Sequence, residues 1–143
     1  MANNIPSRIK VESSKYQLFM ELKDHFSKAY NSDVFALALA YGYKLGIKQP
    51  ISSKEAFIAA PSVSDELKSM IFLVGISEFG SNHINELVEN PVLMYEAAEE
   101  YANAGIDVLY REFEDVGSDF DFKLCGEFAD SIRCLESNKL KEE

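Results

Sequence analysis

The chain has only two cysteines, no tryptophan and no long apolar run. A membrane-spanning helix needs about 20 consecutive apolar residues, so we expect no transmembrane segment. Residues 1–6 lack the apolar core of a secretory signal peptide. Cys125 and Cys134 lie too far apart on one helix to form a disulfide. We therefore expect two reduced thiols and a cytoplasmic protein.

Basic residues are also scarce, with 14 Lys and Arg against 24 Asp and Glu and a net charge of −10. The imbalance is uneven: residues 1–60 carry eight basic and five acidic residues, whereas residues 61–143 carry six and nineteen. A chain this acidic is not expected to coat nucleic acid generally. A local DNA contact through the more basic N-terminal third stays open, and the acidic remainder favours solubility.

Recognisable catalytic or cofactor motifs are missing as well. The two histidines, His25 and His83, have no Cys or His near them at metal-ligand spacing. No glycine-rich loop ends in the Gly-Lys-Ser/Thr of a phosphate site. If Asp119 opened a calcium loop, Lys123 and Leu124 would occupy positions that require an oxygen ligand and a glycine. We expect no metal, no cofactor and no catalytic residues, and therefore a non-enzymatic protein.

The apolar periodicity predicts an all-α fold, a single compact domain over residues 1–143 with five or six helices. The helices are expected over about residues 15–28, 34–45, 64–80, 77–90, 91–116 and 120–135. Residues 54–60 are expected to form a short helical turn closed by Pro61. Residues 8–12 alternate between polar and apolar, so the lead-in over 1–13 either includes a short β-strand or is merely ordered. Residues 137–143 are expected to be a frayed tail.

Two segments have a more specific pattern. The helix over 34–45 carries small residues, including Ala38 and Gly42, so it can approach another backbone closely and is expected to be central. In the segment 99–109, Tyr101 and Gly105 share one helical face, and Asn103 can cap or bond a neighbouring loop. This pattern predicts a structural role. The alternative is a partner surface made by Tyr101, Asn103, Gly105 and Asp107.

Together these segments resemble the Dnd system-associated protein 4 family over residues 15–115. The first matching block consists of Phe35, Ala36, Ala38, Gly42, Tyr43, Gly46 and Pro50. The second consists of Glu99, Glu100, Tyr101, Ala102, Asn103, Gly105 and Leu109, with Ala104 where the family pattern has glycine. The resemblance implies a small protein of bacterial loci for DNA phosphorothioation, in which sulfur replaces a phosphate oxygen of DNA. It implies a setting in modification, restriction and phage defence, and no particular reaction.

The preferred interpretation is an accessory or adaptor protein of such a system, acting through contacts with its other proteins. A homodimer stays open. One alternative is a small DNA-binding regulator, because the expected order strand, helix, helix is typical of ribbon-helix-helix proteins. It would use Arg8, Lys10, Lys44 and Lys48, which would have to converge on one face. A second alternative is an acidic DNA mimic. It requires a spaced row of carboxylates from Glu96, Glu100, Asp107, Glu114 and Asp115.

Overall fold

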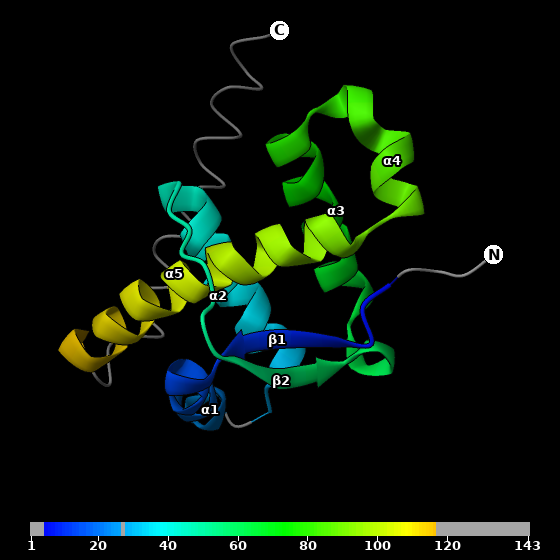
Figure 1. Cartoon of the computed structure of the whole chain (residues 1–143). Helices are drawn as coiled ribbons and strands as arrows, with labels where there is room; N and C mark the ends of the chain where they lie inside the picture. Colours follow the sequence, from blue (N-terminus) through cyan, green and yellow to red (C-terminus); the bar gives the residue numbers. More distant parts are fainter. Residues whose placement is uncertain (1–4, 27, 117–143) are drawn as a thin grey trace, which may run out of the picture. The chain divides into compact units, whose positions relative to one another are not determined.

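A computed structural model describes residues 5–26 and 28–116 (Figure 1). The helix expected over 120–135, both cysteines and the tail 137–143 lie outside these residues. The chain divides into two units after Tyr110, and residues 111–116 are the described part of the second. The expectation of a single domain over the whole chain stays a prediction.

The described residues form five α-helices and one two-stranded antiparallel sheet, which confirms the predicted mostly helical class and its N-terminal strand. The elements, in chain order, are β1 (Arg8–Glu12), α1 (Tyr16–His25), α2 (Asn31–Leu45), β2 (Lys54–Ala59), α3 (Asp65–Phe79), α4 (Ile84–Glu89) and α5 (Val92–Val116). Short 3-10 turns precede α1, α3 and α4. None of the described helices combines the length and apolar character that crossing a membrane requires.

Strand β2 corrects the prediction of a helical turn over residues 54–60. Its first residues, Lys-Glu-Ala, are good helix formers, and this local preference produced the wrong prediction. In the structure they pair with β1, in a register that sets Val11 opposite Glu55 and Ile9 opposite Ile58. The two strands are distant in the sequence, so long-range pairing overrides the local preference.

The core beneath the sheet is aromatic. Phe19 of α1 and Phe35 of α2 are fully buried and stack with their ring centroids 6.4 Å apart. Phe57 of β2 completes the group, 5.1 Å from Phe19. Burying three such rings stabilises the fold by several kcal/mol, at roughly 2–3 kcal/mol for each ring. This cluster fixes the sheet and α1 against one end of α2.

Helix ends follow the sequence signals. Helix α2 ends at Gly46, as predicted, and the φ of this residue is 67°. Such a left-handed conformation suits a residue without a side chain. Ser64 caps α3 by accepting a hydrogen bond from the Leu67 N–H at 3.2 Å, the usual role of a serine at this position. Pro91 immediately precedes α5, where its missing N–H costs nothing.

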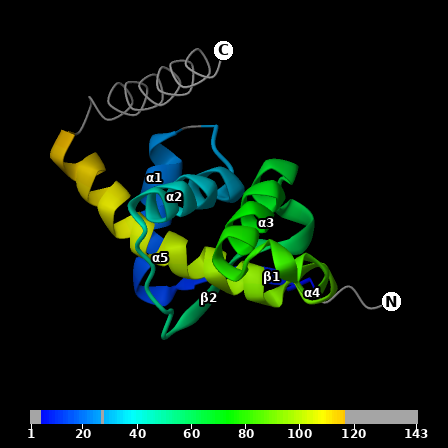
Figure 2. The same ribbon diagram turned by 90° about the horizontal axis from the view of Figure 1, so that it is seen from above.

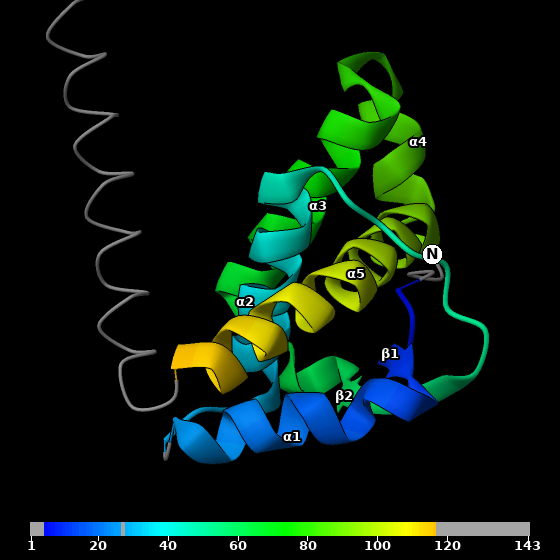
Figure 3. The ribbon, with the colours of Figure 1, turned by 90° about the vertical axis from the view of Figure 1, so that its left-hand side faces the viewer.

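Helices α2 and α3 lie side by side and run in the same direction (Figure 3). At the N-terminal ends, the Ser32 hydroxyl in the first turn of α2 donates at 2.8 Å to the carbonyl oxygen of Ser62, in the 3-10 turn that precedes α3. At their last turns, the Tyr43 hydroxyl is 2.5 Å from the Ser77 hydroxyl. Helix α5 crosses α2, and Figure 2 shows α2 and α3 on the same side of α5.

Candidate functional site

The two segments singled out in the sequence meet where α5 crosses α2. A Cβ placed on Gly105 would lie 2.0 Å from the Ala38 carbonyl oxygen and 2.6 Å from the Gly42 nitrogen. A Cβ placed on Gly42 would lie 2.0 Å from the Tyr101 carbonyl oxygen. Each glycine therefore makes room for the backbone of the other helix. The crossing is closer than any other residue type allows.

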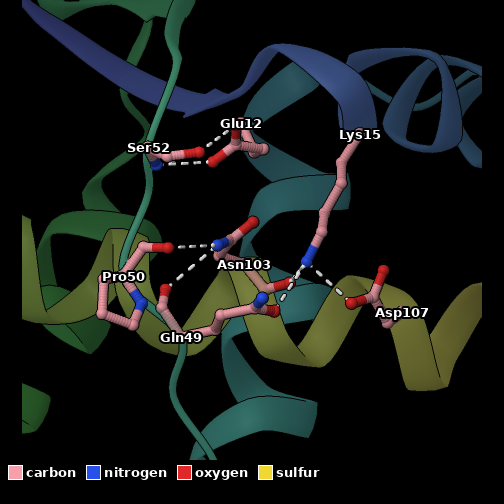
Figure 4. A network of polar contacts seen from close by, with 7 residues as sticks. All are labelled: Glu12, Lys15, Gln49, Pro50, Ser52, Asn103 and Asp107. Atoms are coloured by element: carbon pink, nitrogen blue, oxygen red, sulfur yellow. Dashed lines mark hydrogen bonds and ion pairs between the residues drawn. The ribbon is translucent and has the colours of Figure 1, made fainter.

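Asn103 joins this crossing to the segment that links α2 to β2 (Figure 4). Its side chain is buried, and its amide donates to the carbonyl oxygens of Gln49 at 3.0 Å and Pro50 at 3.3 Å. The Gln49 N–H donates in turn to the Glu100 carbonyl oxygen at 3.0 Å. The asparagine thus provides a hydrogen-bond donor for two backbone carbonyl groups of a linker that has no regular secondary structure.

Lys15 secures the same region from the turn before α1. Its ammonium group donates to the Asp107 carboxylate at 2.7 Å, the Asn103 carbonyl oxygen at 2.8 Å and the Gln49 side chain at 2.9 Å (Figure 4). All three donors of the ammonium group are therefore used. One side chain therefore connects the turn before α1 to the linker after α2 and to α5.

Two glutamates, Glu12 and Glu99, bind backbone N–H groups around β1. They form the polar framework together with Lys15 and Asn103. The Glu12 carboxylate accepts the Ser52 N–H at 2.7 Å (Figure 4). It also accepts the Ser53 N–H at 3.0 Å. The Ser52 N–H is the main cause of the lowered pKa of Glu12. Glu99 of α5 is buried and accepts the Lys10 N–H at 2.6 Å, on the edge of β1 that does not face β2. Burial raises the pKa of Glu99, and the bond from Lys10 opposes this shift.

A second polar cluster lies near the last turns of α2 and α3. Tyr101 donates to the Glu78 carboxylate at 2.7 Å, and Lys48 binds the other oxygen of that carboxylate. The Lys48 hydrogen bond lowers the pKa of Glu78, whereas the bond to Glu78 raises the pKa of Tyr101. Near neutral pH the carboxylate therefore stays ionised and the phenol stays protonated. Neither group is tuned for proton transfer there.

The four residues predicted as a partner surface therefore occupy different environments. Tyr101, Asn103 and Gly105 are buried in contacts within the chain. Asp107 has 39% of its side chain exposed and pairs with Lys15. Most of the contacts made by these four residues are therefore within the chain, and both the structural role and the partner surface stay predictions. The geometry presents little of the segment to a partner.

The four residues considered for DNA contact are not brought together. Arg8 and Lys10 are exposed on β1, which pairs with β2 of the same chain. Lys44 lies in the last turn of α2, about 20 Å along the helix from the end that contacts β2. Figures 1 and 3 show the C-terminal end of α2 well away from β1. Lys48 is engaged by Glu78, so the chain offers no shared basic face from these four.

The acidic row proposed for a DNA mimic is partly formed and partly neutralised. Glu96, Glu100 and Asp107 follow one side of α5 at helical spacing. Asp107 is paired with Lys15. The pKa of Lys48 is raised chiefly by its hydrogen bond to Glu78 and, to a smaller degree, by the charge of Glu100. Glu114 and Asp115 are exposed near the end of α5, within the second unit of the chain.

The two histidines lie apart. His83 follows α3 and faces Glu86 at 3.3 Å, whereas the His25 ring lies 5.0 Å from the Phe26 ring. Among residues 5–26 and 28–116, no three His, Cys, Asp or Glu side chains are placed to hold a metal ion.

An apolar groove between α2 and α3 is the surface that the sequence did not reveal. It encloses about 250 Å³ and is lined by Leu39, Ala40, Tyr43, Lys44, Met70, Leu73 and Val74. Leu73 stands at its edge with 64% of its surface exposed, and Tyr43 is 42% exposed. The exposed leucine belongs to a helix with apolar residues on most sides, so periodicity did not distinguish it from core residues.

No family model, curated protein or solved structure matches the chain.

Proposed function

We propose that the chain is an accessory protein that acts by binding another protein chain in the α2–α3 groove. The exposure of Leu73 beside Tyr43 and Met70 is the observation that carries this proposal. Leaving a leucine in water forgoes roughly 1.5–3 kcal/mol of burial free energy. Apolar residues gathered in a groove are typical of interaction surfaces, whereas single exposed ones are ordinary.

The framework described above supports the same proposal. The charged and polar side chains around the α5–α2 crossing bind groups of this chain itself, and so do Glu78 and Lys48. The groove has the opposite character, because its walls are almost entirely apolar and only Lys44 and the Tyr43 hydroxyl add polarity. An apolar centre with polar groups at its border is the usual composition of an interface.

The resemblance to the Dnd system-associated protein 4 family supports a setting for this activity. On that basis the accessory role belongs to a DNA phosphorothioation-linked modification and restriction system. The groove would then hold this protein in an assembly whose other members carry out the chemistry on DNA.

Co-elution with the purified modification and restriction proteins of a phosphorothioation locus tests the proposal. We expect co-elution that Leu73→Lys abolishes, because a lysine at this position places a charge in the apolar contact. Val88→Lys is the matched control, since Val88 lies on α4 outside the groove and is 62% exposed. Binding that survives Leu73→Lys unchanged would contradict the groove as the docking site.

A further inference from the structure

The face formed by α2 and α3 carries opposite charges on either side of the groove, with Lys44 lining the groove and Asp33 and Glu66 lying beyond it. Asp33 in the first turn of α2 and Lys44 in its last turn are both exposed. Their spacing of about three helical turns places them on one side of the helix, about 16 Å apart. Glu66 is exposed one turn before Met70, which lines the groove. Because α2 and α3 run in the same direction, Asp33 and Glu66 both lie toward the N-terminal ends of the two helices, beyond the groove, and Lys44 lies at its opposite end.

This distribution of charge allows two copies of the chain to attract each other, because the basic end of one can lie against the acidic end of the other. A two-fold axis perpendicular to the groove would reverse its direction in a second copy. Lys44 of each copy would then lie beside Asp33 and Glu66 of the other, and the apolar middles would face each other at Leu73. A two-fold contact uses the same patch on both subunits, so each favourable charge pair is formed twice. The two α2 helices would also run antiparallel, with opposed dipoles.

We propose that the chain forms a symmetric homodimer in which the α2–α3 grooves of two copies pack antiparallel against each other. This inference rests on the proposed function, since it takes the groove to be a protein-binding surface; it commits to a second copy of this chain as the occupant, in place of another protein of the system. Each of the two helices has 15 residues. Together they present a patch of about 22 Å by about 20 Å, taking about 10 Å for the width of each helix. This patch covers about 440 Å² on each copy, below the roughly 800 Å² on each partner of a standard specific interface, so we expect a weak dimer.

Sedimentation velocity of the full chain, from about 1 to about 200 μM, tests the dimer by its dependence on concentration. At about 0.15 M salt the Debye length is about 8 Å. Repulsion between two chains of charge −10 is then screened while close pairs persist. We expect the sedimentation coefficient to rise from that of a monomer to that of a dimer. Leu73→Lys should raise the dissociation constant at least about tenfold, and Val88→Lys should leave it unchanged.

Charge reversal tests the antiparallel arrangement. Lys44→Glu should weaken the dimer, and adding Glu66→Lys should restore at least part of the affinity. Asp33 is left in place, because its carboxylate accepts the Tyr30 N–H at 2.8 Å and caps α2. Lys28→Glu makes the same charge change at an exposed lysine outside the groove and should have no effect. Circular dichroism of each variant verifies that the helices are intact.

Three results would overturn the inference in different ways. A monomer at all concentrations would refute the homodimer, while co-elution with phosphorothioation proteins would continue to test the proposed function. A dimer unaffected by Leu73→Lys would place the dimer contact outside the groove. A dimer weakened by Leu73→Lys, but with no restoration by Glu66→Lys, would refute the antiparallel pairing.

Discussion

Replacing Gly105 with alanine tests the close crossing of α5 and α2. The added Cβ would stand 2.0 Å from the Ala38 carbonyl oxygen. Carbon–oxygen contacts settle at about 3.3–3.6 Å even when they are favourable, so the helices would have to separate by about 1.3 Å. The obstacle is backbone, so no side-chain rotation relieves it.

Two opposing effects determine how much Gly105→Ala changes the free energy of unfolding. Overpacking of a core typically costs about 1–3 kcal/mol, and a backbone obstacle places this case at about 3 kcal/mol. Alanine is favoured over glycine inside a helix by about 1 kcal/mol. The expected net loss in the free energy of unfolding is therefore about 2 kcal/mol. For a chain of this size, that loss corresponds to a fall in melting temperature of about 8 °C.

Urea unfolding followed by circular dichroism measures this loss, with the slope of the transition checked for constancy. Gly75→Ala is the matched control, because the three atoms nearest to its new Cβ all belong to the Met94 side chain, at 2.4 Å for Cγ, 2.7 Å for Sδ and 3.0 Å for Cβ. A methionine side chain is flexible and can move aside. We expect the stability of this control to stay within about 1 kcal/mol of the wild type, since helix propensity offsets the adjustment of Met94. If Gly105→Ala were as stable as the wild type, the close crossing would be refuted.

Three further predictions concern the polar framework. Asn103→Ala should cost about 1–3 kcal/mol in urea unfolding, because two linker carbonyls lose their donor; an unchanged midpoint would contradict this. Lys15→Met should cost about 1–2 kcal/mol because three hydrogen bonds of the ammonium group are lost, and Asp107→Asn less, because two of them remain and the asparagine oxygen can still accept. The lysine side chain is 13% exposed and the aspartate 39%; equal losses would argue against the network. Glu99 has a raised pKa, so the folded state binds more protons and its contribution to stability falls as pH rises above 4.5. In melting curves from about pH 4 to 8, Glu99→Gln should therefore gain stability relative to the wild type as pH rises, and a constant difference would refute this.

Helical periodicity was sufficient to predict most of the fold. The glycine and proline signals at Gly46 and Pro91 marked helix boundaries correctly, because they act through the local backbone. Strand β2 was missed for the opposite reason. Its sequence favours a helix, and pairing with β1 overrides that preference only once the chain is folded.

The candidate sites also divide into features that the sequence predicts and features that depend on packing. The small residues of α2 and Gly105 predicted close approaches, and the structure shows that they approach each other. The sequence held no signal for this pairing, since helix periodicity identifies a face and not its partner. The groove was missed because Leu73 belongs to a helix with apolar residues on several sides. Only packing reveals which of them remains in water.

Substitutions at the buried α5–α2 crossing should lower stability, whereas substitutions in the groove should lower association, and the two effects can be measured separately. The crossing glycines and Asn103 are buried, so their substitution acts on every function through the loss of folded protein. Leu73 is exposed, so Leu73→Lys removes little native packing and should leave the unfolding midpoint nearly unchanged. If Leu73→Lys weakens association while Gly105→Ala lowers only stability, binding and folding reside on separate residues. If both variants lose association in proportion to stability, the groove has no role of its own and the proposal of a docking surface fails.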